Sequence, residues 1–82
     1  MLKVASEVLE LRGVATKTTA KGNMYYLVNC ETDDGTAHQF YCPDYTALPQ
    51  GMKKGDKVRV YFNVKVFERQ EKLIVSKVEV VK

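Results

Sequence analysis

The sequence predicts a small all-β barrel of five strands, and three observations support this prediction. Strand-like segments, in which apolar residues recur at every second position, make up most of the chain. Short breaks rich in glycine, proline, asparagine and aspartate separate these segments. The length of 82 residues suits one domain with a thin core, so we expect a single domain over residues 1–82.

The clearest segment runs from residue 57 to residue 67 and carries different chemistry on its two faces. The apolar positions are Val58, Val60, Phe62, Val64 and Val66, and the positions between them are Arg59, Tyr61, Asn63, Lys65 and Phe67. Alternation with period two places the first set on the core face of a strand and the second set on the outer face. A solvated face does not need aromatic rings. Rings between positive side chains are typical of proteins that bind single-stranded nucleic acid, because rings stack on bases while Lys or Arg contacts phosphate.

Three further strands precede this segment. The first is expected over residues 3–18, where Gly13 interrupts it. A glycine inside a strand often marks a bulge, which lets one long strand belong to two parts of a curled sheet. A glycine-containing turn over residues 19–23 leads to a second strand over residues 24–32, and a third is expected over residues 36–42.

The second and third strands form a hairpin for which two registers are open. A two-residue loop would pair Asp33 with Thr36, whereas a three-residue loop with Gly35 in the left-handed conformation pairs Thr32 with Thr36. We prefer the three-residue loop because it separates polar from apolar side chains better, and a one-residue shift would exchange the two faces. In this register the core face holds Tyr26, Val28, Cys30, Phe40 and Cys42, and the outer face holds Tyr25, Leu27, Asn29, Gln39 and Tyr41.

The connection between the third and fourth strands, residues 43–55, is irregular. Asp44 can cap a short helical turn over residues 45–48, which Pro49 and Gly51 then end.

A turn over residues 68–71 leads to the fifth strand, which is expected over residues 72–81. The apolar spacing slips between Val75 and Val78, which indicates a bulge. Five strands, a bent first strand and a short helical or irregular crossover between strands 3 and 4 describe a small Greek-key barrel of the OB type. An SH3-like barrel is the alternative, although its long loops usually come earlier in the chain.

Composition excludes several classes of protein. The chain lacks an apolar run of about 18 residues, so we expect no membrane span. It also lacks a continuous apolar segment near its start, so we expect no secretory signal. We therefore expect a cytoplasmic protein. The net charge of +3 permits nucleic-acid binding without requiring it. The charges are unevenly distributed, with an acidic stretch that includes Glu31, Asp33, Asp34 and Asp44.

Nothing in the sequence indicates catalysis, a cofactor or a metal. The one histidine, His38, is expected on the core face near the hairpin end in a structural role, and no phosphate-binding glycine loop is present. Cys30 and Cys42 match no common zinc spacing. The preferred hairpin register pairs Cys30 with residue 38, which places the two thiols too far apart for a disulfide. We therefore expect both cysteines to be small buried apolar residues.

The outward aromatic and basic residues predict a binding function. The candidate residues are Lys17, Lys21, Tyr25, Gln39, Tyr41, Arg59, Tyr61, Lys65, Phe67 and Arg69. We expect a non-catalytic protein that binds single-stranded DNA largely independently of sequence, by base stacking and phosphate contacts. The alternative is an OB domain that binds protein through Tyr61, Lys65 and Phe67, because aromatic residues are also enriched in protein interfaces. The sequence does not separate DNA from RNA as the ligand.

Three segments of the chain resemble the small single-stranded DNA-binding proteins of filamentous phages, the gene V type. They are the opening Met1-Leu2-Lys3-Val4, the stretch Lys21-Gly22-Asn23-Met24-Tyr25-Tyr26-Leu27 and the closing apolar segment from Leu73 to Val81. The resemblance implies a five-stranded OB-like homodimer, located in the host cytoplasm if phage-encoded, in which Tyr25 and Leu27 face DNA and basic residues of the preceding loop bind phosphate.

The chain departs from this family in the last hairpin. The family carries a DNA-stacking aromatic residue there, where this chain has Gln70, and the nearest aromatic residue is Phe67. The central part, residues 33–55, looks more like general OB domains. A phage, prophage or plasmid OB protein outside the gene V type is therefore the alternative.

Overall fold

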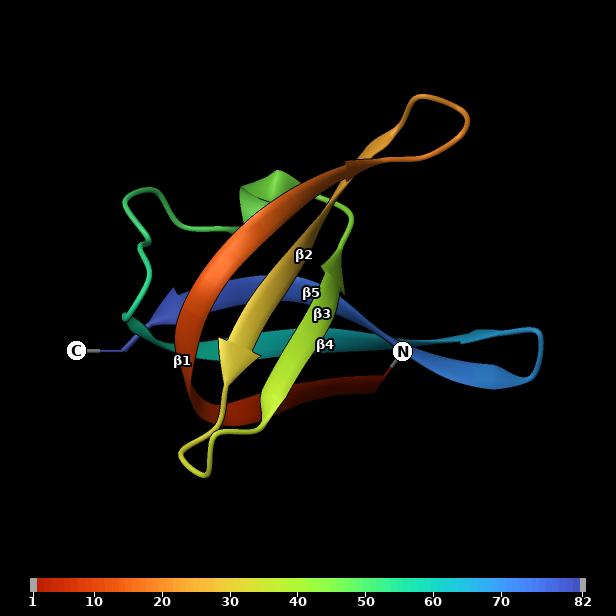
Figure 1. Cartoon of the computed structure of the whole chain (residues 1–82). Coiled ribbons are helices and arrows are strands. Elements are labelled where there is room, and N and C mark those ends of the chain that lie inside the picture. Colours follow the sequence, from red (N-terminus) through yellow and green to blue (C-terminus); the bar gives the residue numbers. More distant parts are fainter. Residues whose placement is uncertain (1, 82) are drawn as a thin grey trace.

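The computed structural model describes residues 2–81 and shows five antiparallel strands that curl into one barrel (Figure 1). The elements are β1 (Leu2–Thr18), β2 (Met24–Glu31), β3 (Ala37–Cys42), the 3₁₀ helix η1 (Tyr45–Ala47), β4 (Lys57–Phe67) and β5 (Gln70–Val80). The strand order is β3-β2-β1-β4-β5, and the end strands β3 and β5 contact each other and close the barrel. The predicted all-β OB-like fold is confirmed.

The long strand β1 belongs to two parts of the sheet, as Gly13 predicted. Its first half pairs with β4 and its second half, from Glu10, pairs with β2. A bulge leaves Arg12 without a partner next to Gly13. A second irregularity, which the sequence did not indicate, follows Ala5, where the Ser6 hydroxyl accepts a hydrogen bond from the Val60 N–H at 2.9 Å. These two breaks bend β1 around the barrel.

The β2–β3 hairpin has the preferred three-residue register. The Thr32 N–H donates to the Thr36 carbonyl at 2.9 Å, and Gly35 has a φ of +86°. Val28 lies opposite Phe40, so the residues predicted for the core face do share one side of the hairpin.

The β4–β5 hairpin differs from the prediction. The prediction of a four-residue turn over 68–71 is wrong, because Glu68 and Arg69 alone form the turn, with φ values of 50° and 64°. Two-residue turns with positive φ match the twist of a hairpin, but they usually contain glycine or asparagine, so residues 68 and 69 carry no local signal for one. Strand β5 therefore begins at Gln70, directly opposite Phe67. The predicted bulge is confirmed and leaves Ser76 without a partner.

The core consists of small and medium apolar side chains from four strands and the end of β3. The buried residues are Leu9, Leu11, Val28, Cys30, Cys42, Val58, Val60, Phe62, Val75 and Val78. Both cysteines are buried as expected, and burial raises the pKa of the Cys30 thiol to about 11. Asp44 caps η1 as predicted by accepting a hydrogen bond from the Thr46 N–H.

The prediction of a core position for His38 is only half right. His38 lies opposite buried Cys30 and stacks on Phe40 with 5.9 Å between ring centroids, but its side chain is exposed. The ring lines an open cavity together with Glu7 of β1 and the polar residues of the hairpin loop, so it stays in contact with solvent. Among residues 2–81, no helix is long and apolar enough to cross a membrane.

Asp34 should make the β2–β3 hairpin sensitive to acid. Hydrogen bonds from the Thr32 hydroxyl and from Thr36 lower the pKa of Asp34 to about 2, from an ordinary value of 3.8. A carboxyl group whose pKa is lower in the folded state than in the unfolded state stabilises the fold at pH values above its unfolded-state pKa. This stabilisation is lost as the pH falls through the folded-state pKa. The stability difference between the wild type and Asp34→Asn should therefore shrink between neutral pH and pH 2. Thermal unfolding across this range measures it, and a constant difference would contradict the assignment.

Candidate nucleic-acid interface

The outer face of β2 and β3 carries a pair of tyrosines. The rings of Tyr25 and Tyr41 lie 5.4 Å apart between centroids at an angle of 46°, and Tyr41 is 42% exposed. Leu27 lies directly opposite Tyr41, and Lys17 of β1 lies directly opposite Tyr25. The preferred register therefore places an aromatic and apolar platform on the outside of the barrel, with an ammonium group at its edge.

Amides and small residues extend this platform along the strands. The Gln39 Nε2 donates to the Asn29 Oδ1 at 3.0 Å. On β1, Gly13 lies beside Asn29 and Ala15 lies beside Leu27. The absence of long side chains on this part of β1 leaves the outer surface open to a ligand chain.

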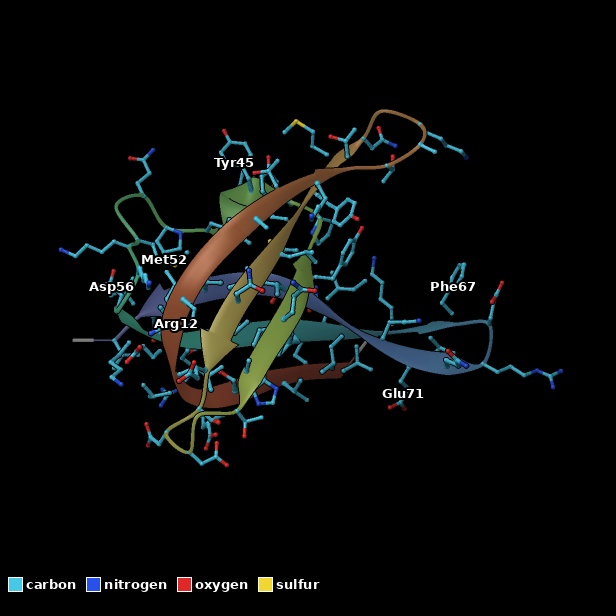
Figure 2. The ribbon with its side chains drawn as sticks, in the orientation of Figure 1. Arg12, Tyr45, Met52, Asp56, Phe67 and Glu71 are labelled. Atoms are coloured by element: carbon cyan, nitrogen blue, oxygen red, sulfur yellow. The ribbon has the colours of Figure 1, made fainter. Side chains whose placement is uncertain are left out.

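A groove of about 590 Å³ connects this platform to the β4–β5 hairpin. Its lining includes Tyr41 from β3, Lys65 and Phe67 from β4, and Lys72 and Ile74 from β5. Figure 1 shows the β4–β5 hairpin and the β1–β2 hairpin projecting on the same side of the barrel, with the end of β3 between them. In Figure 2 the side chains of Phe67 and Glu71 point to opposite sides of the β4–β5 hairpin. Phe67 is 64% exposed.

Two more cavities follow along the outer face of β4. The first, of about 310 Å³, includes Asn63 in its lining and shares Lys65 and Ile74 with the groove beside Tyr41. The second, of about 420 Å³, includes Tyr61 and shares Ser76 with the Asn63 cavity. We call these three cavities together the outer groove. Alternate residues of β4 line it in order, as the period-two pattern of this segment predicted.

Contacts within the protein occupy the Tyr61 end of the outer groove. The Tyr61 hydroxyl donates to a Glu79 carboxylate at 3.5 Å, and the Lys77 ammonium lies 5.5 Å from the ring centroid. Lys77 also forms an ion pair with Glu79 at 3.7 Å. Arg59 lies opposite Glu79, outside the three cavities. A ligand must share or replace these contacts in order to use the Tyr61 ring.

The cations at the bend of β1 have carboxylate partners, whereas Lys65 and Lys72 of the outer groove do not have one among the described residues. At the bend, Arg12 pairs with Glu10 at 2.8 Å and with Glu31 at 3.8 Å, and Lys57 pairs with Glu10 at 3.6 Å. The hydrogen bond from Arg12 holds the pKa of Glu10 below its ordinary value. Lys65 lies directly opposite Lys72, and neither forms an ion pair with another described residue.

The structure brings most of the predicted residues into two connected surfaces. Lys17, Tyr25, Leu27, Gln39 and Tyr41 share the outer face of β1–β3, and Lys65, Phe67 and Tyr61 line the outer groove, which meets that face at Tyr41. Lys21 lies in the β1–β2 turn and Arg69 in the β4–β5 turn, at the tips of the two projecting hairpins.

Sequence reasoning missed Lys72, Ile74 and Asn63 as site residues. Lys72 was predicted to begin the fifth strand, but the side of the sheet on which it lies was not predicted, because the preceding turn was predicted to be two residues longer than it is. Once Phe67 is paired with Gln70, Lys72 falls opposite Lys65 on the same face.

Comparison with solved structures places this chain beside a mitochondrial single-stranded DNA-binding protein, Rim1 from S. cerevisiae. The TM-score is 0.65, and the match covers 99% of this chain and 96% of the other at 19% sequence identity. At this identity the likeness shows a shared fold. No family model and no curated protein sequence matches the chain. The resemblance to the gene V type is therefore not confirmed and stays a prediction.

The Tyr25–Tyr41 ring pair should contribute to stability beyond the area that it buries. Aromatic pairs of this geometry contribute about 0.5–1.5 kcal/mol in double-mutant cycles. Urea unfolding of Tyr25→Leu, Tyr41→Leu and the double variant should give a coupling free energy in this range. A coupling near zero would show that the two rings move independently.

Proposed function

We propose that the protein is a non-catalytic single-stranded DNA-binding protein that binds its ligand across the outer face of β2–β3 and into the outer groove. The structural neighbour, whose title describes a single-stranded DNA-binding protein, supports this class of ligand. The arrangement of rings and cations on this chain supports it independently of that likeness.

The observation that carries the proposal is the opposition of Lys65 and Lys72. Like charges directly opposite each other in a sheet destabilise it, and no described carboxylate pairs with either lysine. A phosphate between the two ammonium groups would relieve this repulsion. Both lysines line the groove that also holds Tyr41 and Phe67, so a phosphate bound there places the adjacent base beside an exposed ring.

The form of the ligand follows from the rings. The exposed rings of Tyr41 and Phe67 and the half-buried ring of Tyr25 can stack only on bases that are free of a duplex. Stacking and phosphate contacts tolerate every base, which gives binding with little dependence on sequence. Lys17 beside Tyr25, and Lys21 and Arg69 at the hairpin tips, would extend the phosphate contacts at both ends of the track.

A protein-binding OB domain is the second candidate, and the apolar side of the β4–β5 hairpin favours it. Val66 is 72% exposed and Leu73 is 50% exposed. A homodimer through this side would lengthen the DNA track, so the two candidates are compatible. Salt separates them, because binding through lysines weakens steeply as salt rises and apolar contacts do not.

Substitution of one groove lysine should strengthen the fold and weaken DNA binding. Lys72→Gln removes the like-charge pair and should raise the free energy of unfolding by roughly 0.2–1 kcal/mol. The same change should lower affinity for oligo-dT and reduce the salt slope of binding by about 0.7, the value for one single-strand phosphate contact. Urea unfolding and fluorescence anisotropy at several salt concentrations measure both effects.

Lys54→Gln is the matched control, because Lys54 is exposed in the connection before β4, outside the outer groove. Lys54→Gln should change both the free energy of unfolding and the salt slope of binding less than Lys72→Gln does. A Lys72→Gln protein with lower stability and unchanged affinity would contradict the role of this lysine.

Removal of the Tyr41 ring should weaken binding to single strands. Tyr41→Ala should cost about 1–3 kcal/mol of binding free energy, the contribution of one base stacked on an aromatic ring. Tyr45→Ala removes another exposed ring, 65% exposed on η1 and outside the outer groove, and should have little effect. Anisotropy titrations with oligo-dT, and with duplex DNA as the weaker ligand, make the comparison. Equal losses for the two variants would mean that the rings bind without a defined track.

A further inference from the structure

Asn63, which lines the middle cavity of the outer groove, carries a polar atom without a partner. The Oδ1 of Asn63 is buried, and no described residue donates a hydrogen bond to it. Unpaired buried acceptors are rare in native proteins, because removal from water is costly unless a hydrogen bond replaces the lost one. Asn63 alternates on β4 with Tyr61 and Lys65, so this atom lies midway along the proposed DNA track.

The Asp44 carboxylate contributes acceptor oxygens to this cavity, and Lys65 contributes an ammonium donor. The Asp44 carboxylate accepts from the Thr46 N–H at 2.9 Å and from the Thr46 hydroxyl at 2.8 Å. These bonds hold the pKa of Asp44 below its ordinary value, so the group is charged at neutral pH. Ser76, at the bulge in β5, adds a hydroxyl to the lining. The Asp44 carboxylate and the Asn63 amide oxygen suit a ligand that brings N–H donors as well as a phosphate for Lys65.

The remaining lining suits a flat ring close to a phosphate. Ile74 and Val75 of β5 and Ala47 of η1 supply apolar walls. Lys65 lines both this cavity and the groove beside Tyr41. A nucleotide whose phosphate contacts Lys65 in the groove would therefore have its base within reach of the Asn63 cavity.

We infer that this cavity is a nucleobase subsite in which the Asn63 amide oxygen accepts a hydrogen bond from the exocyclic amino group of a base. The inference rests on the proposed function and adds one base preference to an otherwise sequence-tolerant track. No hydrogen bond to Oδ1 holds the Asn63 amide in place, so rotation of the amide brings this oxygen to the cavity without loss of a protein bond. Cytosine carries an amino group where uracil carries a carbonyl. Uracil also has one ring N–H donor, but its carbonyl would face the Asp44 carboxylate that lines the same cavity, so cytosine should be preferred.

The test compares oligo-dC with oligo-dU of equal length by fluorescence anisotropy. The wild type should bind oligo-dC about five-fold or more tightly, the lower range for one good polar contact to a base. Asn63→Ala should bind the two equally. Asn63→Asp retains acceptor oxygens and should retain the preference even if overall affinity falls.

Asn29→Ala provides the matched control for the ratio of the affinities for oligo-dC and oligo-dU. Asn29 is also a half-buried asparagine on an outer face, but its Oδ1 already accepts a hydrogen bond from Gln39. Because Asn29 lies on the outer face of β2, this variant should weaken binding of both oligonucleotides to the same degree and keep the preference for oligo-dC. Loss of the preference in both asparagine variants would overturn the assignment to Asn63.

The remaining outcomes are distinguishable. Tight but equal binding of both oligonucleotides by the wild type, or tighter binding of oligo-dU, would overturn the subsite and leave the proposed function intact. Binding of neither would overturn the proposed function and the subsite with it. If Asn63→Ala fails to fold, the side-chain amide NMR signals of Asn63 in the wild type should shift more with oligo-dC than with oligo-dU, and equal shifts would overturn the subsite.

Discussion

The whole barrel depends on β1, which forms hydrogen bonds with β4 along its first half and with β2 along its second half. In a flat five-stranded sheet of this order, β3 and β5 would lie at opposite edges. The bulge at Arg12 and the irregularity after Ala5 bend β1, so the two edges meet. Closure places Tyr41 of β3 beside Lys65 and Lys72, and it thereby creates the groove on which the proposed function rests.

Strand β4 contributes to the core and to the binding surface at the same time. Val58, Val60 and Phe62 fill the interior, while the outer groove is lined by Tyr61, Asn63, Lys65 and Phe67. The unpaired lysines of the groove contrast with the paired charges at the bend of β1, where Arg12 and its carboxylate partners neutralise one another. Lys65 and Lys72 therefore have no described carboxylate partner in the part of the groove that also holds Tyr41 and Phe67.

Local patterns in the sequence were sufficient to predict most of the fold. The alternation over residues 57–67 gave the bounds of β4 correctly, and the polar-apolar separation selected the hairpin register that Gly35 permits. The turn after β4 was predicted with two residues too many, because residues other than glycine and asparagine, such as Glu68 and Arg69, seldom adopt positive φ. The exposure of His38 was missed because it depends on where the barrel ends.

The candidate site was predictable where one strand, or the β2–β3 hairpin with its short loop, determines it. Tyr61, Lys65 and Phe67 follow from the period-two pattern of β4 alone. The opposition of Lys65 and Lys72 depends on the β4–β5 register, and the Asn63 cavity depends on η1 packing against β5. Such features arise from contacts between segments, for which a single sequence carries no local signal.

The most direct test of the proposed track is photochemical cross-linking of single-stranded oligonucleotides that contain 5-iodouracil, followed by mass spectrometry. Cross-links should form at Tyr41 and Phe67, the exposed rings of the groove that also holds Lys65 and Lys72. They should be absent from Tyr45, which is more exposed than Tyr41 but lies outside the groove. Cross-links at Tyr45 in preference to Tyr41 and Phe67 would contradict the account.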